Sequence, residues 1–87
     1  MSGPMGGAAD GPVAEGVFGA LRAWRMAEAK AQSIPPYVIF HDTVLRDIAA
    51  VRPQNLEELS QIKGVGASKL QRYGTRVLVV LAEAGAA

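Results

Sequence analysis

The sequence predicts an all-α fold: a compact orthogonal bundle of about five short helices that follows a flexible N-terminal segment. Apolar residues recur at helical spacings of three and four along most of the chain. Proline, glycine and capping residues divide these stretches at short intervals. The 87 residues, 49% of them hydrophobic and 20% charged, supply enough apolar surface for one core and at most one domain.

The composition also excludes several classes of function. The chain has no cysteine and one histidine, so disulfide frameworks, thiolate metal sites and the usual catalytic triads have no residues to form them. We therefore expect no catalytic residue, no metal and no cofactor. No apolar run reaches the roughly 18 residues of a membrane span, and the N-terminus lacks a signal-peptide pattern. We expect a monomeric cytoplasmic protein that does not engage membranes.

The first predicted helix follows a segment of different composition. Residues 1–16 are rich in glycine and hold two of the five prolines, which favours a flexible linker or an added segment over a packed element. The predicted domain covers residues 17–85. Its first helix runs from residue 17 to about residue 31, with an apolar stripe made by Val17, Leu21, Trp24, Ala27 and Ala31.

Two prolines end that helix. Residues 33–36 contain Pro35 and Pro36, neither of which donates a backbone hydrogen bond. Residues 37–40 then form a short strand or a single helical turn. Asp42 or Thr43 caps a helix that ends at Pro53. The residues of this helix that we expect to face the core are Leu45, Ile48 and Ala49.

A capping box begins the next helix. Asn55 stands three residues before Glu58, so the amide oxygen can accept from the Glu58 N–H while the carboxylate reaches back. This reciprocal arrangement marks a helix start at the sequence level. The expected buried side comprises Leu56, Leu59 and Ile62.

A glycine turn separates the last two predicted helices. Residues 63–66 turn the chain sharply, and a short helix over residues 67–73 is closed by Gly74. Thr75 caps a last helix that runs to about Glu83. The apolar run at residues 77–81, with its three valines, also fits a buried strand. Helix is favoured because no second convincing strand exists to pair with it.

Positive charge is concentrated beside this turn. Residues 1–62 hold five basic and seven acidic side chains, a net charge of −2, whereas no acidic residue lies between Glu58 and Glu83. Glycines allow close approach to a sugar–phosphate chain, and the unpaired amides that begin the next helix can donate to phosphate. Alternatively, the glycines only make a tight interhelical turn. The basic residues of this interval are Lys63, Lys69, Arg72 and Arg76.

A second candidate face lies on the first helix. Arg22, Arg25 and Lys30 stand beside its apolar stripe, where they form either a binding face or an ordinary solvated face. Tyr37 either stacks on an unpaired base or packs on the core with its hydroxyl in water. Arg25 has a further alternative, packing or an ion pair with Glu28. We assign to the core Trp24 and Phe40, and to the surface or a helix cap His41.

Five stretches together carry a family resemblance. They are Leu21-x-x-Trp24-Arg25, Ile-Pro-Pro-Tyr-Val-Ile-Phe at residues 34–40, the helix Asp42-x-x-Leu45-x-x-Ile48-Ala49, the turn and helix at residues 53–59, and Ile62-Lys63-Gly64-Val65-Gly66-x-x-Lys69-Leu70-x-x-Tyr73-Gly74. With them, residues 21–81 closely resemble the HRDC domain, the helicase-and-RNase-D C-terminal module. Residues 34–40 are most similar to those of RecQ-type DNA helicases, followed by UvrD-type helicases and RNase D.

The resemblance implies a bundle of about five short helices and a non-catalytic role. Such a domain helps a parent ATP-dependent DNA helicase, active in DNA repair and recombination at the bacterial nucleoid, to choose single-stranded or branched DNA. The partners are then DNA and the rest of the parent helicase. The alternative is a docking module of a helicase or RNase D-type nuclease, with a protein partner, little DNA affinity and an apolar patch of Tyr37, Val38 and Ile39. The candidate DNA-binding residues are Lys63, Gly64, Gly66, Lys69, Arg72, Arg76, Arg22, Arg25, Lys30 and Tyr37.

Overall fold

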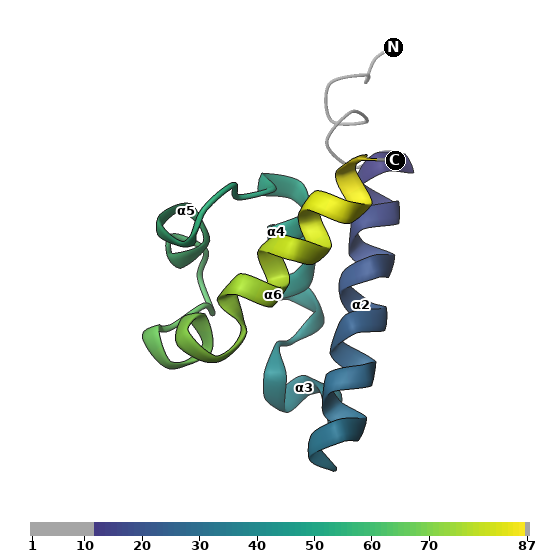
Figure 1. The fold of residues 1–87 in the computed structure, drawn as a ribbon, viewed down its shortest axis with the longest axis vertical. Coiled ribbons are helices and arrows are strands. Elements are labelled where there is room, and N and C mark those ends of the chain that lie inside the picture. The colour runs from purple at the N-terminus through teal and green to yellow at the C-terminus, as the bar shows by residue number, and fades with distance from the viewer. Residues whose placement is uncertain (1–11, 87) are drawn as a thin grey trace.

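Five helices, with no strand, make up the part of the chain that the computed structural model describes, residues 12–86 (Figure 1). The two long helices come first and last, and the three between them are short. This confirms the predicted all-α bundle, although its helices are uneven in length. They are α2 (Pro12–Gln32), α3 (Pro36–Ile39), α4 (Asp42–Val51), α5 (Leu56–Ser60) and α6 (Ala67–Ala86).

The helices pack around one core. α2 packs against α6, α4 and α3, while α5 packs against the first part of α6, and Figure 1 shows α6 crossing α2 at a steep angle. Each fully buried aliphatic side chain of such a core stabilises the fold by roughly 1.5–3 kcal/mol. The largest fully buried side chains come from every described helix and from the residue that follows α3: Val17, Leu21, Ile39, Phe40, Leu45, Ile48, Leu59 and Val77.

α2 begins earlier than the sequence predicted. Pro12 occupies its first position, where a missing N–H costs nothing and the fixed φ of proline suits a helix. Residues 12–16, expected in the flexible segment, are therefore helical. The rest of that predicted segment, residues 1–11, lies outside the described residues.

The buried side of α2 also differs from the predicted stripe. Val17 and Leu21 are buried and Trp24 packs against the core, but Ala27 and Ala31 are exposed. The buried side instead continues at Arg25 and Ala29, with residues 28 and 32 half-buried beside them. Three of these four positions hold polar side chains, so apolarity alone did not mark them.

The segment between α2 and α4 is a helical turn and not a strand. α2 ends at Gln32, Ser33 adopts a left-handed φ of 58°, and the Ile34 N–H donates to the Ala29 carbonyl at 3.0 Å. This pattern closes a helix just before a proline. Pro36 then opens α3, whose four residues make a single turn.

α4 confirms the predicted core residues but not the predicted cap. Leu45, Ile48 and Ala49 are buried. The N-cap position belongs to His41, whose side chain makes no capping hydrogen bond, and Asp42 is already the first helical residue. The helix ends at Val51, two residues before Pro53, as the proline predicted.

The capping box of α5 is confirmed with one shift of partner. Asn55 Oδ1 accepts from the Glu58 N–H at 2.8 Å, whereas Glu58 Oε1 accepts from the N–H of Gln54, at 2.9 Å. Leu59 and Ile62 are buried as expected. Leu56 is 42% exposed, so its assignment to the buried side was wrong.

α6 is one continuous helix, and the predicted stop at Gly74 with a new cap at Thr75 was wrong. A Cβ built on Gly74 would lie 2.7 Å from Leu56 Cδ2. The glycine thus permits α5 to approach α6 closely and does not end the helix. The run at residues 77–81 is helical, with Val77 and Leu81 buried and Val79 exposed.

Candidate nucleic-acid interface

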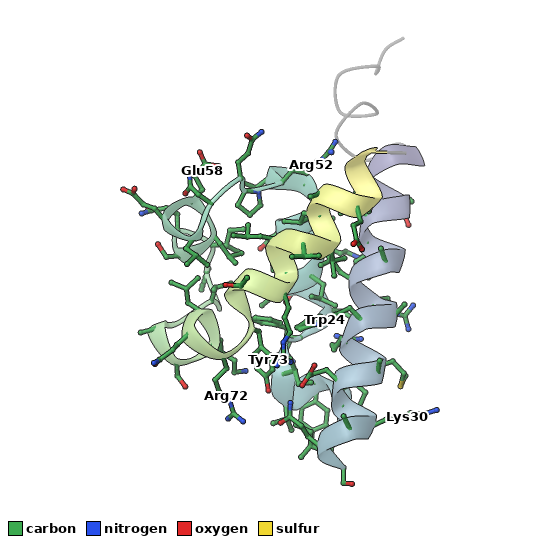
Figure 2. The ribbon with its side chains drawn as sticks, viewed as in Figure 1. Trp24, Lys30, Arg52, Glu58, Arg72 and Tyr73 are labelled. Carbon is green, nitrogen blue, oxygen red and sulfur yellow. The ribbon has the colours of Figure 1, made fainter. Side chains whose placement is uncertain are left out.

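Three cations of α6 share one side of the helix. Lys69, Arg72 and Arg76 are spaced by three and four residues, which brings side chains together on a helix surface. We call these three residues the basic ridge. In Figure 2, Arg72 projects at the end of the molecule opposite to the end that carries Arg52 and Glu58. Arg72 therefore places a positive charge at that end of the bundle.

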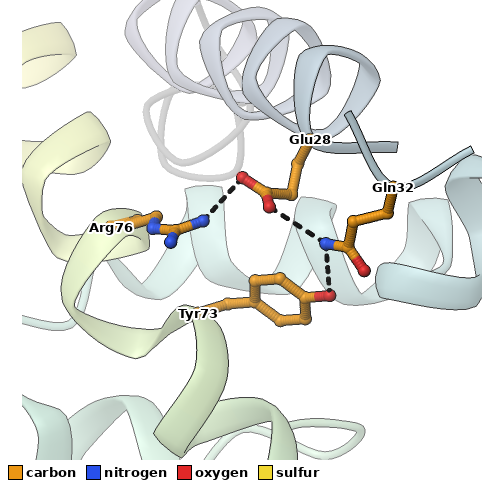
Figure 3. Close-up of polar contacts among 4 residues, drawn as sticks. All are labelled: Glu28, Gln32, Tyr73 and Arg76. Atoms are coloured by element: carbon orange, nitrogen blue, oxygen red, sulfur yellow. Dashed lines mark hydrogen bonds and ion pairs between the residues drawn. The ribbon is translucent and has the colours of Figure 1, made fainter. Parts of the chain in front are cut away.

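A polar network anchors the ridge to α2 (Figure 3). Glu28 Oε1 accepts from Arg76 Nη1 at 2.7 Å, and Glu28 Oε2 accepts from Gln32 Nε2 at 2.9 Å. The same Gln32 nitrogen donates to the Tyr73 hydroxyl oxygen at 2.9 Å. The hydrogen bonds from Gln32 and Arg76 lower the pKa of Glu28, against the effect of burial, and the charges of Arg76 and Arg72 lower it further. Glu28 therefore stays anionic and neutralises part of the ridge.

Arg72 and Arg76 are both exposed, and Arg72 differs from Arg76 in its lack of an anionic partner among the described residues. The Arg72 guanidinium carbon lies 5.7 Å from the centroid of the Tyr73 ring. Among residues 12–86 Arg72 makes no ion pair. A guanidinium in this situation presents its donors in a planar fork that matches phosphate.

Lys69 is largely engaged inside the protein. Its ammonium donates to the backbone carbonyl oxygens of Val38, at 2.7 Å, and Ile39. It also lies 5.4 Å from the centroid of the Phe40 ring. The first residue of the ridge thus joins α6 to α3.

α3 presents an aromatic ring to solvent. Tyr37 is 60% exposed, and its ring stacks on His41 with centroids 6.0 Å apart and planes inclined by 29°. Tyr37 is therefore held out and not packed on the core. Val38 is exposed as well, whereas Ile39 is buried and does not belong to the apolar patch that the sequence suggested.

Arg25 is not on the surface. It is only 6% exposed; Nη1 donates to the Phe40 carbonyl at 2.8 Å, and Nη2 lies 2.7 Å from Asp42 Oδ1. Of the alternatives for this residue, packing with an ion pair is the one observed, but the partner is Asp42 and not Glu28. Because its guanidinium is enclosed and both terminal nitrogens are bonded within the protein, Arg25 does not join a binding face.

Two further arginines, Arg22 of α2 and Arg46 of α4, lie over the Phe18 ring. Arg25, through its hydrogen bond, is the main cause of the lowered pKa of Asp42, and the charges of Arg22 and Arg46 add to it. Both of these guanidiniums sit over the Phe18 ring, at 5.8 Å and 4.1 Å from its centroid. Arg46 was not among the predicted residues, and its Nη1 lies 3.4 Å from Glu15 Oε2.

The glycine turn combines a packing role with an open backbone. Gly64 has a φ of 96°, and a Cβ there would lie 2.5 Å from Val44 Cγ2. Gly66 has nothing within 4 Å of a built Cβ. Packing therefore accounts for the first glycine and leaves the second open to close approach.

The remaining predicted cations point elsewhere. Lys63 lines a shallow groove of about 300 Å³ between α4 and α5, beside Asp47 and Glu58. Lys30 lies toward the same end as Arg72 but projects away from α6 (Figure 2). The structure thus joins the ridge to Tyr37 through Lys69, and it does not bring Lys30 or Lys63 to them.

Residues 12–86 contain neither a cluster of metal-binding side chains nor a helix that could span a membrane. Their His, Asp and Glu side chains nowhere gather in a group of three or more that could hold a metal ion. The helices in this range are also too short or too polar to cross a membrane.

Comparison with known proteins places the chain among helicase and nuclease segments. Residues 14–81 match the HRDC domain family, as the resemblance predicted. The chain is 45% identical over 58 residues to the ATP-dependent DNA helicase UvrD2 of Mycobacterium tuberculosis, covering 67% of this chain and 8% of that protein. It is 37% identical over 67 residues to the ATP-dependent DNA helicase RecQ of Haemophilus influenzae, covering 77% and 11%.

The similarity extends to a nuclease. The chain is 39% identical over 70 residues to the ribonuclease D of Granulibacter bethesdensis, covering 79% of this chain and 18% of that protein. It thus spans less than a fifth of the length of these three relatives. No solved structure matches it significantly.

Proposed function

The chain belongs to the HRDC domain family, and from this premise we propose that it is an auxiliary, non-catalytic module of a larger ATP-dependent DNA helicase. It binds single-stranded or branched DNA mainly through phosphate contacts and helps the parent enzyme to choose its substrate. The named helicases and ribonuclease D among its relatives support a nucleic-acid-associated role. We place it in the cytoplasm with the bacterial nucleoid, as a monomeric module within its parent.

One observation carries this proposal: the basic ridge lies beside an exposed aromatic ring. Arg72 is exposed and unpaired among the described residues, and Lys69, one turn earlier, bonds the carbonyl that follows Tyr37 in the chain. Cations in such a row contact phosphates, and an exposed ring stacks on an unpaired base for about 1 to 3 kcal/mol. The open backbone at Gly66, at the start of α6, offers amide donors to the same strand.

The proposal predicts a salt-dependent affinity. Contact of the two ridge arginines with two phosphates of a single strand gives a log–log slope of about −1.4 between affinity and salt concentration, and each further phosphate contact makes it steeper by about 0.7. The measurement is fluorescence anisotropy with labelled oligothymidylate between about 50 and about 200 mM salt. A salt-independent titration, or no binding at near-millimolar DNA, contradicts it.

Two charge reversals test whether DNA binding depends on the basic ridge or on the net charge of the domain. Arg72→Glu and Lys63→Glu change the net charge equally, but Lys63 sits in the groove beside Asp47 and Glu58. We expect Arg72→Glu to weaken oligothymidylate binding roughly tenfold or more, and Lys63→Glu by no more than about twofold. Equal losses would mean that binding follows overall charge.

A docking module remains the second candidate function. Tyr37 and Val38 are both exposed on α3, and together they form a small apolar patch suited to the parent enzyme or another protein. Chemical-shift mapping with oligothymidylate separates the candidates. Shifts at the ridge and Tyr37 support DNA binding, whereas the absence of shifts at near-millimolar DNA supports docking.

A further inference from the structure

α3 is too short to be stable as an isolated helix. It consists of four residues, and a single turn is far below the length at which a helix is stable by itself. Pro35 at its N-cap makes no side-chain capping hydrogen bond. Yet this turn carries Tyr37, the exposed ring of the proposed interface. The position of that ring therefore depends on contacts from other helices.

The buried side chains of Ile39 and Phe40 anchor the end of the turn in the core, and two cations hold three consecutive carbonyl groups beside them. Lys69, from α6, bonds the carbonyls of Val38 and Ile39. Arg25, from α2, bonds the carbonyl of Phe40 at 2.8 Å. Hydrogen bonds with a charged donor are shorter and stronger than neutral ones. They also place positive charge at the negative end of a helical turn.

The two cations differ in how many hydrogen-bond donors they have left for a ligand. Arg25 is enclosed, with one guanidinium nitrogen on a carbonyl and another on Asp42. Lys69 is partly exposed, but an ammonium has three donors and two of them already serve carbonyls. To grip a phosphate with all its donors, Lys69 would have to release α3.

From this geometry we infer that Lys69 is a positioning residue of the DNA-binding surface. It fixes the α3 turn, and so the Tyr37 ring, and it acts on DNA through base stacking and not through a phosphate contact. This inference rests on the proposed function, and it divides the basic ridge: Arg72 contacts phosphate, whereas Lys69 holds the aromatic platform.

A double-mutant cycle with oligothymidylate tests the inference. Tyr37→Ala removes the stacking ring and should weaken binding about 5-fold to about 100-fold. Lys69→Met should weaken binding about 5-fold or more in the wild type and by less than about 2-fold in the Tyr37→Ala background, because its effect passes through the ring. The salt slope should stay unchanged in Lys69→Met.

Arg72→Met is the matched control on the same helix face. Its effect should be the same in both backgrounds, and its salt slope should be shallower by about 0.7, the value for one phosphate on a single strand. If Lys69→Met behaves as Arg72→Met does, with a multiplicative loss and a shallower slope, Lys69 contacts phosphate and the inference is overturned.

A second measurement needs no DNA and separates this inference from the proposed function. In the free protein, Lys69→Met should abolish NOEs between the Tyr37 and His41 rings and lower the backbone order parameters of residues 37–39 from about 0.85 to below about 0.6. Arg72→Met should leave both unchanged. Retained NOEs and order parameters in Lys69→Met overturn the positioning role, even if the wild type binds DNA well.

Failure of the proposed function gives a different result. If the wild type does not bind DNA, the proposed function is overturned, and with it the role of Lys69 in DNA binding. This holds even if the NMR measurement shows that Lys69→Met releases the Tyr37 ring in the free protein. Thermal unfolding is measured for every variant, and titrations are made below the lowest midpoint. Should Lys69→Met not fold, Lys69→Gln removes the charge while keeping a donor, and the same cycle applies to it.

Discussion

Arg25 shows how one side chain can change its apparent role once its surroundings are known. Arg22 and Arg25 flank the same apolar stripe of α2, and by sequence either is a candidate for phosphate. The chain after α3 passes over only one of them, so Arg25 becomes enclosed and bonds Phe40 and Asp42. That path is a tertiary feature, which spacing within one helix does not contain.

We therefore expect the main effect of Arg25→Met to be a loss of stability and not a loss of charge-dependent binding. Methionine fills much of the space but leaves the buried Phe40 carbonyl without its donor, which costs about 1 to 3 kcal/mol in the free energy of unfolding. Urea denaturation measures this cost. Arg22→Met, at an exposed position, is the matched control, expected within about 0.5 kcal/mol of the wild type. Equal stability of the two variants would contradict the structural role of Arg25.

Glu28 makes stability depend on pH in a defined direction. Its pKa is lowered below 4.5 in the folded protein, first by the Gln32 hydrogen bond and then by Arg76. The unfolded carboxyl therefore binds its proton at higher pH than the folded one does. The resulting stabilisation is fully present above the unfolded pKa and is lost as the pH falls through the folded value.

Glu28→Gln should remove that dependence. The gap in unfolding free energy between wild type and variant should be constant near neutral pH and close as the pH falls below about 4.5. Urea midpoints measured from neutral pH to about pH 3 give the gap directly. The other acidic residues are unchanged between the two proteins, so their titration largely cancels. A gap that persists unchanged at low pH would show that the Glu28 network contributes nothing through its charge.

Among the elements of the fold, the turn before α6 contains two glycines that have different roles. Gly64 has a left-handed φ of 96° and no room for a Cβ beside Val44, whereas Gly66 has open space. Gly64→Ala should cost about 2 kcal/mol or more, since the left-handed conformation alone costs about 1 to 2 kcal/mol and the clash adds to it. Gly66→Ala should stay within about 0.5 kcal/mol of the wild type. Thermal unfolding distinguishes them, and a similar cost at both positions would contradict this account of the turn.

The elements themselves could be predicted largely from local sequence. Prolines, the Asn55 capping box and the spacing of apolar residues all act within a few residues, so the starts and ends of α4 and α5 are predicted nearly correctly. The prediction of helix ends fails where a residue far away in the sequence determines the local structure. Gly74 is typical of a helix stop, yet it lies within a continuous helix, where the absence of a Cβ leaves room for Leu56 of α5. Nothing within α6 reveals that neighbour.

For the whole molecule, the candidate site could be predicted only in part. The concentration of positive charge after Glu58 points to the helix that carries the basic ridge, and an exposed Tyr37 is one of the two alternatives that the sequence allows. However, basic residues that are close in the sequence do not all lie together in the folded protein. Lys63 precedes α6 and lies in the groove between α4 and α5, and Arg46 joins Arg22 from a different helix. The direction of each side chain is set by helix packing.

If DNA binds at the basic ridge as proposed, the Glu28–Arg76 pair affects how much Arg76 adds to the affinity. The Glu28 carboxylate lies 2.7 Å from Arg76 Nη1 and would compete with a phosphate oxygen for that nitrogen. A phosphate that replaced the carboxylate would form one charged contact while breaking another, so Arg76 would contribute less than Arg72, which is unpaired among residues 12–86.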